Sequence, residues 1–281
     1  MANWDDISSE GNVEDRRGTT PAIAFAGGGG IIALLLTLGL NFLGLSVDPS
    51  TVESVLNTVQ SLNAGQATQV EQPPEYKGND SYEVFTKKVL GSTDDTWTGV
   101  FQRNGLTYAK PRLVLFRDAT QSGCGLATTQ VGPHFCPEDD TIYLDETFFD
   151  ELHTRFGSDV GKVAQAYVIA HEVGHNVQKQ LGVFDNGPVS TASESVDVEL
   201  QADCYAGVWA YTQAKNGLFV DGDIDQALSA AAAVGDDHIQ EVTQGYSNPE
   251  TWTHGSSAER VNAFKVGYTT GQPGKCTNLQ Q

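Results

Sequence analysis

The sequence predicts an α+β fold, in which a small antiparallel or mixed sheet precedes a set of longer helices. Short runs typical of strands lie at residues 111–117, 125–130 and 141–144. Farther along, apolar residues recur at helical spacing to about Leu181, and an amphipathic run then extends from Thr191 to Asn216. Strands followed by helices in this way are typical of α+β domains.

Further helices are predicted around this pattern. Residues 82–90 and 94–103 look helical, and residues 223–234 form another helical run. Ser158 can cap the helix that leads to Leu181. Residues 81–281 amount to about 200 residues, which is enough for one domain with its own core. We see no internal repeat.

The pentapeptide HEVGH at residues 171–175 is the strongest chemical signal. Residues four apart share one face of a helix, so His171 and His175 can place two imidazole nitrogens on one metal ion. Glu172 is the natural general base, because it can reach the metal's water. Gly174 weakens the helix and so indicates that another element packs closely there. The alternative is a core helix with two hydrogen-bonded histidines.

The next predicted helix supplies a third ligand. Thr191 and Glu194 form a capping box at its start. Glu199 and Asp203 are four residues apart, so they share a face. Glu199 would complete a His2Glu zinc site, and Asp203 would accept the free N–H of a ligating histidine. The alternative is a pair of solvated carboxylates, but the neighbouring alanines favour burial.

His254 lies just before another helix, which Ser256 and Glu259 begin with a second capping box. A positioned histidine can donate to the oxyanion that forms when water attacks an amide. We expect His254 either in that role or as a local cap, and we favour a structural ion pair for Arg260. The remaining histidines without ligand spacing are treated as non-catalytic; they are His134, His153 and His238.

Three ordered segments carry a resemblance to a known family: HEVGHNVQ at 171–178, ELQADCYAGVWA at 199–210 and THGSSAERVNAF at 253–264. The chain resembles the bacterial neutral zinc metallopeptidase family, which comprises membrane-anchored, gluzincin-like HExxH zincins. The resemblance implies a zincin-like metalloprotease domain over residues 81–281, with Zn²⁺ as cofactor. It also implies that residues 124–136 form or adjoin an edge strand that binds an extended peptide.

The expected function is therefore that of a membrane-anchored zinc endopeptidase, in which His171, His175 and Glu199 bind zinc and Glu172 activates water. Its partner would be a peptide or protein substrate. The alternative is a zinc-stabilised extracytoplasmic binding or assembly module with little turnover. A zinc amidase would use the same ligands.

The N-terminal part of the sequence predicts how the protein is placed relative to a membrane. Residues 21–45 contain no charge and are long enough to cross about 30 Å of hydrocarbon. Arg16 and Arg17 precede them, so the positive-inside rule predicts a cytoplasmic tail at 1–20 and an extracytoplasmic catalytic domain. Residues 46–80 would be a polar linker. A cleaved signal peptide is the alternative, although this apolar segment is longer than usual and lacks a clear cleavage site.

The four cysteines agree with export, because disulfides persist in oxidising compartments. Four cysteines allow three pairings, and the sequence alone does not choose among them. We favour Cys124–Cys136 and Cys204–Cys276. The alternative for Cys204 is a free buried thiol.

The charge balance limits the partners. The chain has 16 Lys and Arg against 36 Asp and Glu, a formal net charge of −20. Nucleic acid and anionic lipid surfaces would be repelled, so we expect no nucleic-acid partner. The acidic runs near residues 138–140 and 221–225 do not match the EF-hand pattern for calcium.

Overall fold

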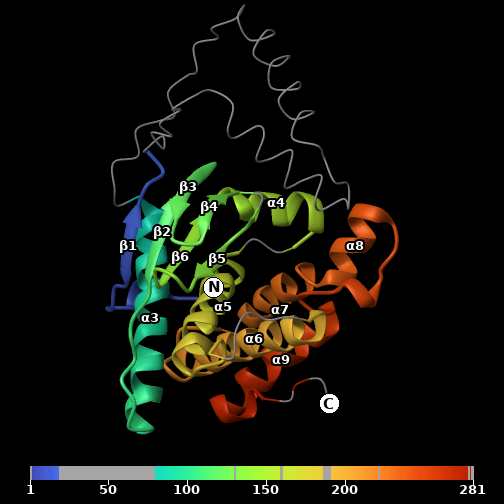
Figure 1. The fold of residues 1–281 in the computed structure, drawn as a ribbon. Helices are drawn as coiled ribbons and strands as arrows, with labels where there is room; N and C mark the ends of the chain where they lie inside the picture. The colour runs from blue at the N-terminus through green and yellow to red at the C-terminus, as the bar shows by residue number, and fades with distance from the viewer. Residues whose placement is uncertain are drawn as a thin grey trace, which may run out of the picture. The chain divides into compact units, whose positions relative to one another are not determined.

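A computed structural model describes residues 2–18, 80–129, 131–158, 161–185, 191–220, 222–277 and 279. Its strands are β1 (Asn12–Asp15), β2 (Arg112–Phe116), β3 (Ala119–Ser122), β4 (Gly125–Thr128), β5 (His134–Cys136) and β6 (Thr141–Asp145). Its α-helices are α3 (Ser81–Arg103), α4 (Thr147–Phe156), α5 (Lys162–Gln180), α6 (Ala192–Lys215), α7 (Asp223–Ala233), α8 (Asp236–Gln244) and α9 (Ser257–Thr270). The predicted α+β class is confirmed (Figure 1).

The main sheet is mixed and has the strand order β1-β2-β6-β5. β1, β2 and β6 are parallel, whereas β5 runs antiparallel to β6 at the opposite edge. The hairpin of β3 and β4 forms a separate two-stranded sheet. The predicted strands correspond to β2, β4 and β6. β5 lies within residues 124–136 and is an edge strand, as the resemblance implied.

Alternation along β2 and β6 divides the core. On one face, Leu113 and Leu115 belong to the large apolar cluster that also includes residues of α3, α5, α6, α7 and α9. On the other face, Val114 and Phe116 pack in a smaller cluster with Ala127 of the hairpin. The sheet is therefore buried on both sides over these strands.

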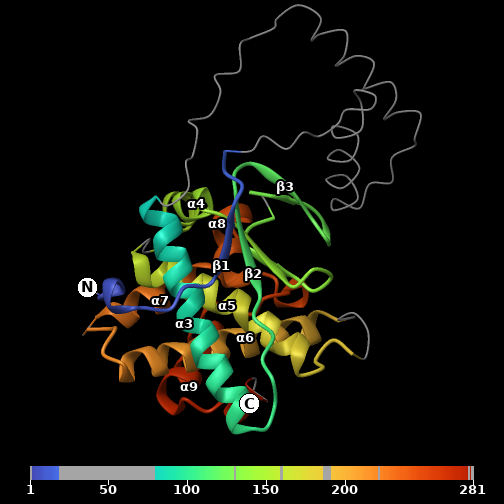
Figure 2. The same ribbon diagram turned by 90° about the vertical axis from the view of Figure 1, so that its left-hand side faces the viewer.

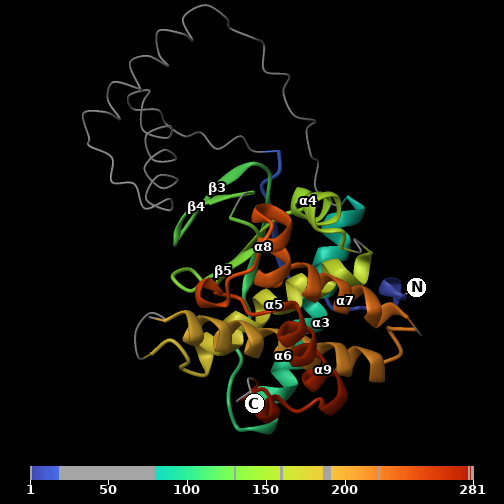
Figure 3. The same cartoon turned by 90° about the vertical axis from the view of Figure 1, so that its right-hand side faces the viewer.

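The helices after the sheet form the layer that carries the chemistry. α5 contacts β5, α6 and α7, and α6 also packs along α9 (Figures 1 and 3). The two helical segments predicted before the sheet, 82–90 and 94–103, form one continuous helix, α3. Gly161, and not Ser158, is the N-cap of α5, because the helix begins only at Lys162. Both predicted capping boxes, at the starts of α6 and α9, are confirmed.

Two disulfides join the predicted pairs, Cys124–Cys136 and Cys204–Cys276. The first closes the segment that contains β4 and β5. The second ties the C-terminal end to α6. Both pairings favoured from the sequence are confirmed, and among the described residues no cysteine is free.

The expected membrane anchor at 21–45 and most of the linker at 46–80 lie outside the described residues. Within the described part of the chain, no helix is both long and apolar enough to span a bilayer. Residues 2–18, which we expected as a separate tail, belong to the same compact unit as the domain from residue 80 onward. β1 joins this segment to β2 (Figure 2).

Candidate metal centre

α5 and α6 bring two histidines and one glutamate together. Nε2 of His171 lies 3.2 Å from Oε2 of Glu199, and Nε2 of His175 lies 3.5 Å from Oε1 of the same residue. The three side chains offer ligand atoms that all lie within 4.8 Å of one another. Two imidazole nitrogens and one carboxylate oxygen are a donor set typical of catalytic zinc, so the residues fit the ion that the sequence predicted.

The close approach of the two helices depends on Gly174. A Cβ atom built at this position would lie 3.0 Å from both Cα and the carbonyl oxygen of Ala202 on α6. Such contacts are tighter than ordinary packing, and the backbone cannot move aside as a flexible side chain can. The glycine that weakens α5 therefore allows α6 to bring Glu199 within reach of the two histidines. The sequence predicted close packing of another element at Gly174, and α6 is that element.

Asp203 holds His171 in place. Its Oδ1 lies 2.8 Å from Nδ1 of His171 and accepts from the Tyr167 hydroxyl at 2.5 Å. The Asp203 side chain is fully buried, which alone would raise its pKa, but Arg260 and His171 lower that pKa to about 2. The carboxylate is therefore ionised at neutral pH. It favours the tautomer with the proton on Nδ1, which leaves Nε2 as a lone-pair donor to a metal.

Arg260 completes this buried group. Its Nε and Nη2 donate to the two oxygens of Asp203 at 2.8 and 3.0 Å, and Nη1 donates to the carbonyl of Val234 at 3.2 Å. The two-pronged pair fixes α9 against α6. This geometry agrees with the structural role that the sequence favoured for Arg260.

His175 has a supporting residue that the sequence reasoning missed. Nδ1 of His175 lies 2.8 Å from Oε1 of Gln178, one turn along α5. Gln178 is fully buried, and its Nε2 donates to the carbonyl of Val198 on α6 at 2.7 Å. Gln178 therefore orients a candidate ligand and links the two ligand helices. The only signal was its spacing of three residues from His175.

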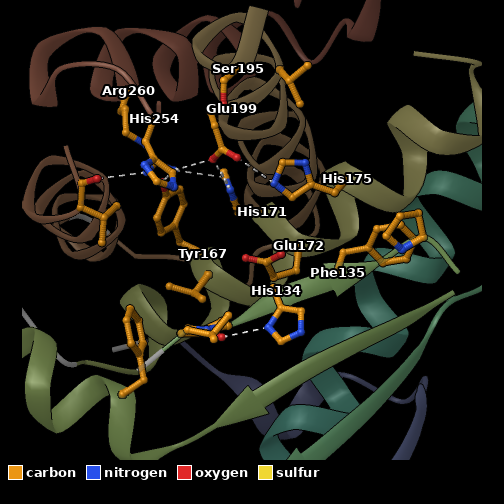
Figure 4. A pocket seen from close by; sticks show the side chains of 18 of the residues that line it. His134, Phe135, Tyr167, His171, Glu172, His175, Ser195, Glu199, His254 and Arg260 are labelled. Carbon is orange, nitrogen blue, oxygen red and sulfur yellow. Dashed lines mark hydrogen bonds and ion pairs between the residues drawn. The ribbon is translucent and has the colours of Figure 1, made fainter. Parts of the chain in front are cut away.

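The three candidate ligands open onto a cavity of about 570 Å³ (Figure 4). Glu172, which directly follows His171 on α5, lines the same cavity (Figure 4). His254 and Arg260 line the cavity from the side of α9. Much of the remaining wall is apolar and includes Val131, Phe135, Pro137, Phe148, Val168, Phe184, Val198, Val234 and Ile239.

His254 is held by Asp236, the first residue of α8. Nδ1 of His254 lies 3.2 Å from Oδ1 of Asp236. Oδ2 of Asp236 accepts hydrogen bonds from the backbone N–H groups of Thr253, His254 and Gly255 at 2.7, 2.6 and 3.1 Å. The hydrogen bond with Asp236 is the main cause of the raised pKa of His254. Burial alone would raise the pKa of Asp236, but its hydrogen bonds with His254 and Thr253 lower it. Asp236 lies 18 residues upstream, and nothing in the sequence singled it out.

The other histidines divide between the cavity and the surrounding fold. His134 lines the cavity from β5, and its Nδ1 lies 3.1 Å from the carbonyl of Gly132. His153 and His238 are not among the lining residues; each instead has a ring nitrogen within hydrogen-bond distance of a backbone carbonyl. His134 is therefore a neighbour of the site that spacing alone did not reveal.

The two histidines of a HExxH helix meet a glutamate from the following helix beside an open cavity. This arrangement places the protein in the class that has a HExxH metal site with two histidines and a glutamate as candidate ligands. Within that class, the chain belongs to the family described as "Putative neutral zinc metallopeptidase", whose sequence model matches residues 2–279. Zinc is thus the metal that both the family and the ligand set indicate.

The curated relatives that match the chain are described as uncharacterized proteins. The chain is 38% identical to the uncharacterized protein YpfJ of Escherichia coli K12 over 292 residues, which cover 98% of each protein. It is 50% identical to the uncharacterized protein Rv2575 of Mycobacterium tuberculosis H37Rv over 182 residues, which cover 60% of this chain and 62% of the relative. No solved structure matches the chain.

Proposed function

We propose that the protein is a zinc-dependent endopeptidase that hydrolyses peptide bonds outside the cytoplasm. The observation that carries the proposal is Glu172, a carboxylate that lines an open cavity next to the His171, His175 and Glu199 cluster. A purely structural zinc site is closed by four protein ligands and needs no acid at its side. The two disulfides favour an oxidising compartment.

The chemistry follows from the residues around the cavity. When bound, zinc polarises the scissile carbonyl and lowers the pKa of a coordinated water. Glu172 accepts the proton of the attacking water and then passes it to the leaving amine. His254, oriented by Asp236, donates a hydrogen bond to the oxygen that becomes negative. Asp203 and Gln178 keep the two histidine rings in the required orientation.

The cavity favours an extended peptide with large apolar side chains. β5 is an edge strand of the main sheet, and its residues His134 and Phe135 line the cavity. An extended substrate can pair with such an edge through main-chain hydrogen bonds. Its side chains would then meet the apolar wall, which includes Phe148 and Phe184.

The test compares the purified full-length protein with the Glu172→Gln variant. We expect one zinc per chain in both proteins, and cleavage of a peptide library by the unmodified protein alone. The full chain is required, because a fragment that starts at residue 81 would lack β1 of the main sheet.

Other outcomes would refute the proposal in different ways. Cleavage of equal rate in the variant would remove Glu172 from the mechanism. Zinc in both proteins with cleavage in neither would favour a zinc-stabilised binding or assembly module. An absence of zinc from both would remove the metal centre itself.

A further inference from the structure

The N-terminal segment, residues 2–18, is part of the fold but has no role in the proposed mechanism. β1 pairs in parallel with β2, with Asn12 opposite Arg112 and Asp15 opposite Leu115. The pairing continues past the strand, because the N–H of Arg16 donates to the carbonyl of Leu115 at 2.7 Å. Figure 2 shows β1 alongside β2, with α3 beside them.

The same segment contributes to the core. Trp4 is 7% exposed, and its ring lies 5.0 Å from that of Phe85 and 6.1 Å from that of Phe219. The backbone passes so close to α3 that a Cβ built at Gly91 would lie 2.6 Å from the carbonyl carbon of Ser9. A segment packed this closely is part of the folded domain and not a separate tail.

Ion pairs fix the end of the segment. The Arg17 side chain is 1% exposed and pairs with Asp15 at 2.7 Å, Asp80 at 2.8 Å and Glu146 at 2.9 Å. Arg16 pairs with Glu14 at 2.7 Å. These are the two arginines on which the positive-inside argument rested, and the fold uses both within the domain.

The pair between Arg17 and Asp80 joins the residues on either side of the intervening segment 19–79. The chain therefore leaves the domain and returns to it at one place. Neighbouring strands lie only about 5 Å apart, whereas the hydrocarbon core of a bilayer is about 30 Å thick. A single membrane crossing between residues 18 and 80 is incompatible with the pairing of β1 and β2.

We propose that residues 2–18 and the domain from residue 80 onward share one side of the membrane, and that this side is extracytoplasmic. The two disulfides of the domain assign the compartment. The proposal replaces the expectation of a cytoplasmic N-terminus. It does not depend on peptidase activity, because the shared side follows from strand pairing, packing and ion pairs, and the compartment follows from the two disulfides.

The first arm of the test traps the strand pair in intact cells that express the full-length chain. Asn12→Cys and Arg112→Cys are combined, because the two residues are opposite each other and neither is buried. Free thiols are blocked with an alkylating reagent before lysis, so that no bond can form afterwards. We expect a monomeric crosslinked species, detected by its mobility without reductant. The matched control combines Asn12→Cys with Lys265→Cys on α9 and should give no crosslink.

The second arm reports the compartment. Ser8→Cys places a thiol at an exposed position of the N-terminal segment, where folding is not expected to suffer. We expect a membrane-impermeant thiol reagent to label it as strongly in intact cells as after permeabilisation. Labelling only after permeabilisation would overturn the proposal. So would labelling in intact cells without the Asn12–Arg112 crosslink, because β1 would then not pair as described.

Discussion

The ligand helices and the main sheet organise their residues in opposite ways. On α5, the candidate ligands His171 and His175 lie four residues apart, and α6 follows directly with Glu199. In the sheet, β2 pairs with a strand roughly 100 residues earlier, since Asn12 lies opposite Arg112. Chemistry is therefore encoded locally, whereas the sheet that supports it depends on distant pairing. Changes in the two regions should consequently have separable effects.

The largest effect is expected in the helices from Glu199→Ala. This change removes the only carboxylate among the three candidate ligands, so zinc should be lost on dialysis and activity with it. Metal content measured by atomic spectroscopy gives the answer. Asp197→Ala, an exposed position two residues earlier on α6, is the matched control and should retain zinc. Full zinc content in the Glu199 variant would remove this residue from the ligand set.

The sheet region should respond to Arg17→Ala with a loss of stability rather than of metal affinity. The change leaves Asp15, Asp80 and Glu146 without their shared buried partner. Breaking such a pair costs about 3–5 kcal/mol of the free energy of unfolding. Denaturant unfolding measures this cost, and zinc content of the folded fraction should not change.

Arg16→Ala is the control for that comparison, because the Arg16 side chain is 25% exposed. Its ion pair is closer to the surface, so we expect about 1 kcal/mol or less. Equal losses in the two variants would mean that burial of Arg17 does not determine the cost. A loss of zinc from folded Arg17→Ala protein would break the separation between the two regions.

Gly174→Ala tests the contact between the ligand helices. Alanine favours an isolated helix by about 1 kcal/mol, but here its Cβ would press on the backbone of Ala202. We expect a net loss of about 1–3 kcal/mol and weaker zinc binding in a chelator competition. In Gly99→Ala on α3, the new Cβ meets only the end of the Arg103 side chain at 3.2 Å, so no such loss is expected. Unchanged zinc affinity in Gly174→Ala would show that the helices can separate without moving the ligands.

The smallest effect concerns pH and the pair of Asp236 and His254. The folded-state pKa of His254 is raised above 6.5, so its stabilisation is complete below pH 6.5 and is lost as pH rises through the folded value. The pKa of Asp236 is lowered below 3.8, so its stabilisation is complete above pH 3.8 and is lost as pH falls through the folded value. Glu199 and Arg260 act on His254 in opposite directions.

Asp236→Asn should therefore lower the melting temperature most between about pH 3.8 and 6.5, and less on either side. Thermal melts of both proteins across this range provide the measurement. A difference that does not depend on pH would mean that the backbone hydrogen bonds of Asp236, and not its charge, dominate.

The sequence predicted the helices and the candidate ligands because their signals are local. Spacing placed His171 and His175 on one face, and the capping boxes marked where α6 and α9 begin. Gly174 even indicated the close contact that Ala202 makes. These inferences needed no knowledge of how distant segments meet.

Other features could not be predicted because they depend on tertiary contacts. The residues of β1, Asn-Val-Glu-Asp, contain one apolar side chain and so lack the alternation that marks a strand. Asp236 gains its role only when α8 meets the segment before α9, and Gln178 links the two ligand helices only when α5 meets α6. The disulfide pairing was one choice among three until the fold fixed it.

The parallel pairing of β1 with β2 also determines when β1 can form its native contacts during synthesis of the chain. β1 emerges from the ribosome first, but its partner follows only after roughly 100 further residues, or about 5–20 s at ordinary elongation rates. During that interval the backbone of β1 has no native partner in β2, and Trp4 lacks its contact with Phe219 for longer still. The residues of β1 therefore remain without their strand partner until β2 has been synthesised.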